Sequence, residues 1–180
     1  MKRLLFVLLL LLAQPIFAQG RLSATSGEVR LNASTPLEDI NAVNTQISAA
    51  LDASTGEIAV LLLIREFEFR KRLMQEHFNE NYMESDKYPR ATIKGTLGAT
   101  LQLADGASET FTLSGALDIH GVTRDVEIPV LISRQGDSYT LSCDFIVDSE
   151  AHEIEVPRML FKKIAREVQV TVTLVLEPAR

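Results

Sequence analysis

The side chains best suited to catalysis or metal binding in this 180-residue chain are three histidines, His77, His120 and His152, and one cysteine, Cys143. No two histidines have the short spacing at which neighbouring residues ligate zinc. The chain lacks the G-x-S-x-G motif of a nucleophilic serine, and Cys143 has no local Cys–His signature. We therefore predict no catalytic residues, no metal ligands and no cofactor.

An enzymatic alternative stays open at this point. It would be a hydrolase or isomerase that acts on an apolar substrate with His77 or His120 as general base. A general base must lie within hydrogen-bond reach of the proton it removes and needs a partner to orient it. The sequence shows no such partner for either histidine.

Charge and composition exclude several classes of protein. The chain has 18 basic and 24 acidic residues, which give a net charge of −6. An acidic protein does not suit a phosphate-binding surface, so no nucleic-acid partner is predicted. A single cysteine excludes a disulfide within the chain, and its length fits one domain. Stability must therefore come from a packed core or a closed sheet.

Residues 1–18 are typical of a secretory signal peptide. Lys2 and Arg3 precede the apolar run Leu4 to Leu12, and the small residue Ala18 ends the segment. The run is too short for a membrane-spanning helix, which needs about 20 apolar residues. Cleavage would leave 16 basic and 24 acidic residues, a net charge of −8, in one domain of residues 19–180. We expect a periplasmic or secreted protein.

Alternation of apolar and polar residues dominates the rest of the chain and predicts β-strands with one apolar face. The clearest run is Arg90 to Leu103. In Glu57 to Phe69 the apolar residues change parity near Arg65, which indicates either a strand covered on both faces or a bulge. Further strands are predicted at Phe111–Ile119, Val126–Ile132, Tyr139–Val147 and Val168–Leu176, and more weakly around Val29 and Leu31 and from Val43 to Leu51.

These eight strands favour an all-β fold, an eight-stranded antiparallel up-and-down barrel. Closure removes exposed sheet edges. The inward residues are mostly small or aliphatic, which is compatible with a cavity for one small ligand. A two-sheet sandwich with a filled core remains the alternative, because period-2 alternation does not distinguish the two.

Two turns predict strand registers. Gly121 suits the first central position of a type II′ turn, so that Gly121 and Val122 form the loop. The pairs would then be Leu117 with Val126, Asp118 with Asp125, Leu113 with Val130 and Phe111 with Ile132. A turn around Gln135 and Gly136 would pair Ile132 with Tyr139, Val130 with Leu141, Ile128 with Cys143 and Val126 with Phe145. Three strands would share one apolar face, which a one-residue slip would disrupt.

Two helices are predicted. Alternation is lost from Arg70 to Met83, where one face carries Leu73, Met74, His77, Phe78 and Tyr82 at helical spacing. A shorter helix is predicted from Pro157 to Lys163, because proline favours the first helical position.

Several segments, in order and spacing, resemble the central signature of the YceI-like family. They are Phe67–Phe69, Leu73–Phe78, Tyr82–Ala91, Ile93–Gly95 and Gly115–Arg124. The resemblance implies an exported, lipocalin-like, eight-stranded barrel that binds polyisoprenoid lipids or isoprenoid-tailed quinones. Ile93 replaces an aromatic residue of the family motif, which implies a locally wider pocket or a changed lipid preference.

We therefore predict binding, storage or transport of a hydrophobic isoprenoid-type lipid inside the barrel, with only transient membrane contact for lipid exchange. A homodimer is also compatible with the sequence. Arg124 is expected to be a solvated turn residue, with contact to a lipid head group as the alternative. A filled barrel that serves in envelope interactions or stress is the second rival function. The predicted ligand-binding residues are Phe67, Phe69, Leu73, Met74, His77, Phe78, Tyr82, Ile93, Phe111, Leu113, Leu117, Val126, Ile128 and Val130.

Overall fold

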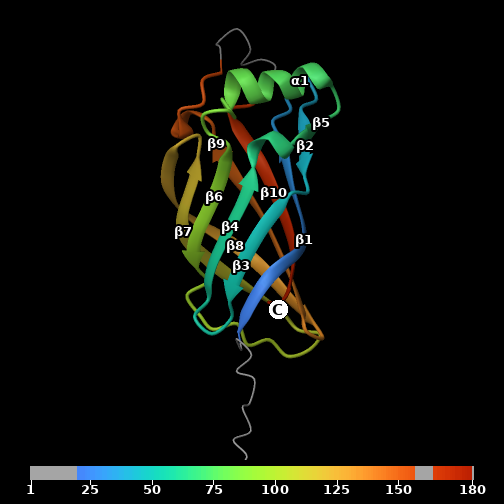
Figure 1. Cartoon of the computed structure of the whole chain (residues 1–180), viewed down its shortest axis with the longest axis vertical. Helices are drawn as coiled ribbons and strands as arrows, with labels where there is room; N and C mark the ends of the chain where they lie inside the picture. The colour runs from blue at the N-terminus through green and yellow to red at the C-terminus, as the bar shows by residue number, and fades with distance from the viewer. Residues whose placement is uncertain (1–19, 157–163, 180) are drawn as a thin grey trace, which may run out of the picture.

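The computed structural model describes residues 20–156 and 164–179 (Figure 1). The predicted signal peptide and the predicted helix Pro157–Lys163 lie outside the described residues. The strands are β1 (Arg21–Asn32), β2 (Asn41–Asn44), β3 (Ile47–Asp52), β4 (Glu57–Leu63), β5 (Glu68–Phe69), β6 (Arg90–Thr96), β7 (Ser108–Ile119), β8 (Val122–Gln135), β9 (Ser138–Asp148) and β10 (Glu167–Pro178). The helical elements are the 3-10 turn η1 (Ile64–Glu66), α1 (Arg72–His77), the π-helical turn η2 (Phe78–Tyr82) and the 3-10 turn η3 (Glu150–His152).

The sheet closes into the predicted eight-stranded antiparallel barrel. Strands β1, β3, β4, β6, β7, β8, β9 and β10 pair in this order, and β10 pairs back to β1. The short strands β2 and β5 extend the sheet from one end of β1. Helix α1 lies across one end of the barrel, and long loops lie at the other (Figure 1). No helix in the described ranges has the length and apolar character needed to cross a membrane.

Both predicted hairpin registers are wrong by two residues. Leu117 pairs with Arg124, and Leu113 pairs with Ile128. The β7–β8 loop consists of His120 and Gly121, whose φ angles of 56° and 76° suit a type I′ turn. Moving the loop by one residue shifts every pair by two, so the same side chains still face inward. In the next hairpin Ile132 likewise pairs with Leu141 instead of Tyr139.

The corrected register removes the predicted contact between Asp118 and Asp125. Asp118 instead pairs with Thr123, whose hydroxyl donates a 2.7 Å hydrogen bond to the Asp118 carboxylate. The outer face of this hairpin therefore carries a hydrogen bond where like charges were expected.

The predicted strand Arg90–Leu103 is shorter than expected, because β6 ends at Thr96. Gly98 follows with φ +70°, a conformation that breaks a strand. The loop then enters the barrel: Leu97 and Leu101 are both buried, and the Leu101 N–H donates to the Ala53 carbonyl at 2.7 Å. The alternation continues here because the leucines of this loop fill the end of the barrel, and not because the strand continues. We call residues 97–107 the plug loop.

The parity change near Arg65 is produced by the 3-10 turn η1, which separates β4 from β5. Ile64 is buried in this turn, and its N–H donates to the Pro89 carbonyl at 2.9 Å. The turn reverses the side on which the following residues project, so Phe67 is buried in the interior. A local break, and not a strand covered on both faces, explains the pattern.

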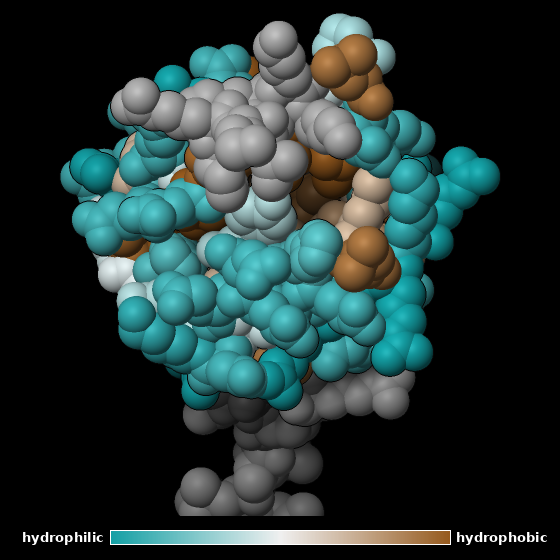
Figure 2. Space-filling view, turned by 90° about the horizontal axis from the view of Figure 1, so that it is seen from above, coloured by the Kyte–Doolittle hydropathy of each residue, from teal (hydrophilic) through white to brown (hydrophobic). Residues whose placement is uncertain are grey.

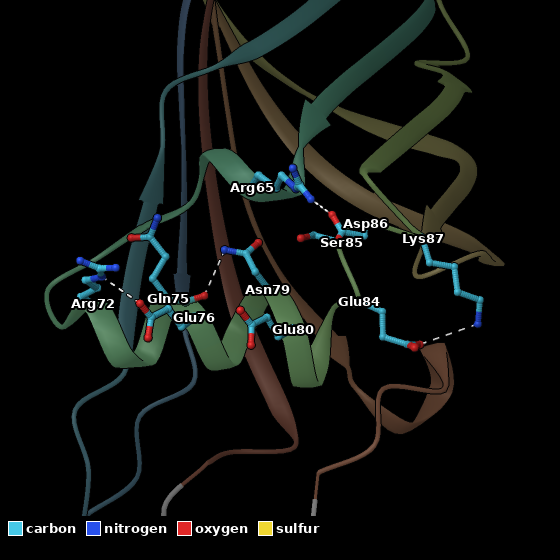
Figure 3. A pocket seen from close by; sticks show the side chains of 10 residues that line it. All are labelled: Arg65, Arg72, Gln75, Glu76, Asn79, Glu80, Glu84, Ser85, Asp86 and Lys87. Atoms are coloured by element: carbon cyan, nitrogen blue, oxygen red, sulfur yellow. Dashed lines mark hydrogen bonds and ion pairs between the residues drawn. The ribbon is translucent and has the colours of Figure 1, made fainter.

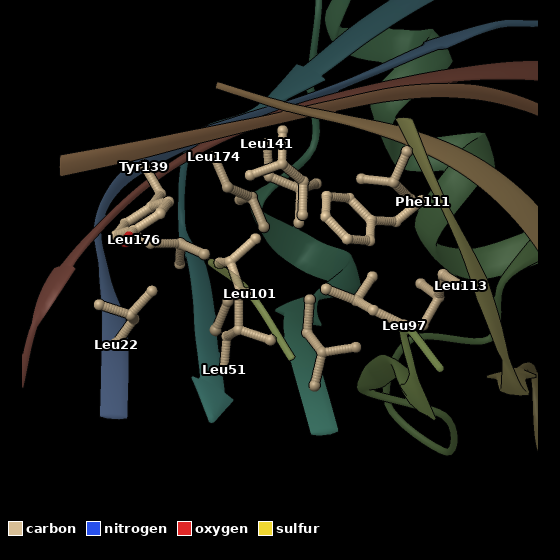
Figure 4. Close-up of a cluster of buried hydrophobic side chains, with 14 of the residues drawn as sticks. Leu22, Leu51, Leu97, Leu101, Phe111, Leu113, Tyr139, Leu141, Leu174 and Leu176 are labelled. Atoms are coloured by element: carbon tan, nitrogen blue, oxygen red, sulfur yellow. The ribbon is translucent and has the colours of Figure 1, made fainter. Parts of the chain in front are cut away.

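One end of the barrel is filled by its own side chains (Figure 4). Leucines from several strands and from the plug loop pack there with Phe111 and Tyr139 into one cluster. Val130, Ile132, Leu174 and Leu176 are fully buried in it. The other end, beneath α1, contains the cavity described next.

Candidate functional site

A cavity of about 570 Å³ occupies the barrel interior between α1 and the filled core. Its lining is almost entirely apolar and comes from the inward faces of the strands and from the inner face of α1 and η2. Five lining residues also belong to the filled core and form the floor: Ile58, Leu113, Ile128, Leu141 and Leu174. Seen from above, hydrophobic surface lies recessed behind a hydrophilic rim (Figure 2).

A glycine allows the floor to close. A Cβ atom on Gly27 would lie 2.3 Å from Cγ2 of Ile47 and 2.6 Å from Cδ2 of Leu174. Both separations are shorter than a carbon–carbon contact permits. Because Gly27 has no side chain, these two lining residues can approach each other over β1.

The structure brings most of the predicted ligand-binding residues together. Eleven of the fourteen line this cavity: Phe67, Phe69, Leu73, Met74, His77, Phe78, Tyr82, Ile93, Leu113, Leu117 and Ile128. Ile93 and Leu117 are a cross-strand pair of β6 and β7, so both contribute to the same part of the wall. Contact between these residues and a ligand stays a prediction.

The other three predicted residues, Phe111, Val126 and Val130, do not line the cavity. Phe111 and Val130 are buried in the filled core, and Val126 packs against it. The leucines of the plug loop pack into the same cluster, so these three residues lie at the filled end of the interior. Alternation had predicted those leucines to be part of the strand Arg90–Leu103.

Part of the lining was missed. One wall is formed by alternate residues of β10, which are Val168, Val170, Val172 and Leu174, and by Val29 and Leu31 of β1. Their inward parity was visible in the sequence. Which of them lie beneath the helix was not, because strand tilt and register decide the height of each residue along the barrel.

Aromatic side chains form the roof of the cavity. The rings of Phe67 and Phe78 meet edge to face with centroids 5.6 Å apart, and Phe69 lies 4.9 Å from Phe78. The π-helical turn places Phe78 and Tyr82 over the cavity, and the Met83 N–H donates to the Phe78 carbonyl at 2.8 Å. Single π-turns are frequent at functional sites. The predicted helix Arg70–Met83 is thus realised as α1 followed by η2.

Few polar groups face the cavity. Lys71 and Glu38 at its rim form an ion pair with Nζ and Oε1 2.8 Å apart. The Ser149 hydroxyl donates to the Arg166 carbonyl at 2.9 Å. Burial raises the pKa of the Tyr82 phenol above its ordinary value. These groups leave the interior without a net charge among the described lining residues.

Cys143 also lines the cavity, as a half-buried free thiol. Burial, and then the neighbouring charge of Asp144, raise the pKa of this thiol to about 11. The thiolate is the reactive form of cysteine, so Cys143 is a poor nucleophile at neutral pH.

His120 and His152 do not line the cavity and serve as structural links. The Nδ1 atom of His120 lies 3.2 Å from the His152 carbonyl oxygen, and its Nε2 lies 3.2 Å from Oε2 of Glu84. The Nδ1 atom of His152 lies 3.1 Å from the Val122 carbonyl oxygen. His152 is 4% exposed and is therefore buried at this contact.

Residues 20–156 and 164–179 contain no cluster of histidine, cysteine and carboxylate side chains suited to a metal ion. Arg124 is exposed, and its Nε donates to the Ala151 carbonyl at 2.9 Å. It does not line the cavity. This position matches the expectation of a solvated turn residue.

A second, polar groove of about 740 Å³ lies on the outer side of α1 (Figure 3). Its three basic side chains are each paired with an acidic one: Arg65 with Asp86, Arg72 with Glu76, and Lys87 with Glu84. Because the basic groups are already paired, the groove offers no concentrated charge to a ligand.

Comparison with known proteins identifies the family and the fold. The family model of the YceI-like domain matches residues 17–176. No curated protein sequence matches this one. A polyisoprenoid-binding domain from Saccharophagus degradans, implicated in plant cell wall breakdown, is similar in structure, with a TM-score of 0.77, 16% identity and coverage of 88% of this chain and 98% of that chain.

Two further solved structures share the fold. BcnA of Burkholderia cenocepacia has a TM-score of 0.69 and 18% identity over 83% of this chain and 95% of its own. A YCEI protein of Campylobacter jejuni has a TM-score of 0.57 and 14% identity over 75% and 82%. At such low identities the likeness shows the fold alone.

Proposed function

Because this chain belongs to the family of YceI-like domains, we propose that it binds a hydrophobic isoprenoid-type lipid, a polyisoprenoid or an isoprenoid quinone, beneath α1. The observation that carries the proposal is the apolar cavity of about 570 Å³ above a closed floor. The polyisoprenoid-binding domain of Saccharophagus degradans supports a lipid-binding role, since it shares this fold.

The physical chemistry of the cavity suits an isoprenoid tail. Burying apolar surface contributes roughly 25 cal/mol per Å². A branched hydrocarbon needs no polar contact along its length, and the walls supply mainly valine, leucine, isoleucine and phenylalanine. The affinity can therefore come from the buried apolar area alone, while a few polar groups near the helix set the orientation of the bound lipid.

The arrangement of the histidines argues against the enzymatic rival. Both ring nitrogens of His120 already face an oxygen atom of the protein. His77 lines the cavity, but its ring has no hydrogen-bond partner among the described residues that could orient it as a base. We therefore propose a binding protein without catalysis.

The cavity also argues against the second rival, a filled barrel that serves in interactions or stress. That rival needs an interior that is packed throughout, as it is at the end of the barrel away from α1. The interior beneath α1 is lined but not filled. We propose storage or transport of the lipid in an exported protein, with transient membrane contact for lipid exchange. Export and a homodimer remain predictions from the sequence.

Native mass spectrometry tests the proposed function. The protein, purified from its own cell envelope under mild conditions, is expected to carry an added mass that dissociates as a neutral or singly charged lipid. Thin-layer analysis of an organic extract then identifies the lipid class. A ligand-free protein that also fails to bind added isoprenoid quinones would overturn the proposal.

The matched control for this experiment places the same bulky residue inside and outside the barrel. Leu117→Trp fills the cavity wall, whereas Leu131→Trp adds the ring on the outer face, where Leu131 is 46% exposed. Loss of the lipid mass in the first variant and its retention in the second would locate the ligand inside the barrel.

A further inference from the structure

We propose, on the basis of the proposed function, that the bound lipid carries an uncharged, hydrogen-bonding head group, an alcohol or a quinone, held at the helix end by Tyr82 and His77. Its isoprenoid tail then points toward the closed floor. The alternative head group of isoprenoid lipids is a phosphate, which the described lining residues do not accommodate.

The charges at the cavity speak against a phosphate. Among the described lining residues the fully charged side chains are Lys71 and Glu38, and they pair with each other at 2.8 Å. A phosphate is ordinarily recognised by unpaired Arg or Lys side chains or by converging backbone N–H groups. Here an anion would have to displace Glu38 from Lys71 and would meet its carboxylate.

Tyr82 and His77 are the polar side chains on the helical side of the lining that have no partner among the described residues; Thr92 of β6 is a further lining hydroxyl, on the strand wall. Both lie on the segment formed by α1 and η2, and both face the cavity. Neither side chain makes a hydrogen bond to another described residue, whereas the Ser149 hydroxyl is already bonded to the Arg166 carbonyl. Tyr82 is half-buried, and this burial raises the pKa of its phenol.

Their chemistry matches an uncharged head group. A phenol both donates and accepts one or more hydrogen bonds, and a neutral imidazole offers one donor and one acceptor. A quinone carbonyl can accept from both side chains, and an alcohol can accept from one and donate to the other. Half-buried Tyr82 gains most from such a partner, because an unpaired polar group is costly in an apolar site, whereas exposed His77 can reach the head group from the rim.

The floor determines the direction of the tail. Residues shared with the filled core close the cavity away from the helix, and they are all aliphatic. Ile47 and Leu174 come together there over Gly27. A polar head group at this end would be desolvated without a partner, so the tail lies toward the floor and the head toward Tyr82.

The test compares three probes that share one C15 tail: farnesol, farnesyl phosphate and the hydrocarbon farnesene. Each competes with an environment-sensitive apolar dye in the mature protein at pH 7.5. We expect farnesol to bind at least about tenfold more tightly than farnesyl phosphate. Equal or tighter binding of the phosphate would overturn the inference.

Variants that remove the polar atoms of the two side chains test the assigned residues. Tyr82→Phe and His77→Phe are expected to weaken farnesol about fivefold each, the effect of one lost hydrogen bond, and to leave farnesene unchanged. Tyr88→Phe removes the same atom from a tyrosine outside the lining and is expected to change neither. Equal losses for farnesol and farnesene in Tyr82→Phe would overturn the role of the hydroxyl.

Binding of farnesene, which has no head group, tests the proposed function separately from the head-group inference. If farnesene binds and the head-group preference is absent, the inference alone fails. If none of the three probes displaces the dye, and a short-chain quinone does not either, lipid binding in this cavity fails and the head-group assignment falls with it.

Discussion

Leu117 and Val130 are both buried aliphatic residues that point into the barrel, but their surroundings differ. Leu117 of β7 lines the cavity, while Val130 of β8 is 0% exposed within the filled core. A side chain added at Leu117 has free volume beside it. The same addition at Val130 meets close-packed atoms, because folded cores leave few voids.

We expect Leu117→Trp to keep or raise the melting temperature of the ligand-free protein and to abolish lipid binding. Val130→Trp is expected to lower stability by about 1–3 kcal/mol, the usual cost of overpacking. Thermal melting followed by circular dichroism measures both. A comparable loss of stability in the two variants would show that the interior at Leu117 is filled.

The reactivity of the Cys143 thiol should depend on pH differently in the folded and the unfolded protein. Burial raises its pKa from 9.0 to about 11, so folding disfavours the thiolate. The alkylation rate of the folded protein should therefore keep rising until about pH 11, whereas that of the urea-unfolded protein should level near pH 9. The rate of iodoacetamide labelling, measured by intact mass, checks this. A folded-state plateau near pH 9 would contradict it.

At the scale of elements, the β7–β8 turn connects the barrel to the segment that follows η2. Gly121 has φ +76°, and a Cβ atom there would lie 2.6 Å from Cε1 of Tyr88. The Tyr88 ring in turn packs on His120, with centroids 4.4 Å apart. The turn therefore depends on glycine for two reasons, the backbone angle and the space.

Gly106 separates these two reasons. It has φ +77°, but a Cβ atom there would meet nothing within 4 Å. Gly106→Ala should cost about 1–2 kcal/mol, the penalty of a left-handed conformation. Gly121→Ala should cost more, because the Tyr88 ring must also move. Urea unfolding measures the difference in stability. Equal losses of stability in the two variants would show that the Tyr88 ring moves aside without cost.

On the scale of the whole molecule, one barrel combines a packed half and a hollow half. The packed half supplies stability, since most of the fully buried leucine, isoleucine and valine side chains belong to it. The hollow half leaves apolar walls without partner atoms. Missing contacts of this kind cost dispersion energy, which a ligand can restore.

Lipid binding should therefore raise the stability of the whole domain. A ligand that binds only the folded state, at about 100 times its Kd, adds about 2.7 kcal/mol. Melting with and without a short-chain isoprenoid quinone measures the shift. Leu117→Trp serves as the control and should show no shift. A quinone that leaves the wild-type melting temperature unchanged would contradict binding in the cavity.

The sequence by itself determined the eight barrel strands in outline, their inward faces, the apolar face of the helical segment and the family, which the comparison confirms. These features are local. Alternation fixes which side chains share one face of a strand, whatever the partner strand is. Ten of the eleven predicted lining residues reached the cavity on such local faces, five on strands and five on the helical segment of α1 and η2.

Only the tertiary structure decided the height of each residue in the barrel. A shift of two residues preserves every inward face, so the pattern could not distinguish Leu117 opposite Val126 from Leu117 opposite Arg124. The alternation of Leu97, Leu101 and Leu103 predicted a strand, but in the structure these side chains fill one end of the barrel. Which half is packed and which is hollow depends on these non-local contacts, because free volume is a property of the assembled barrel and not of any single strand.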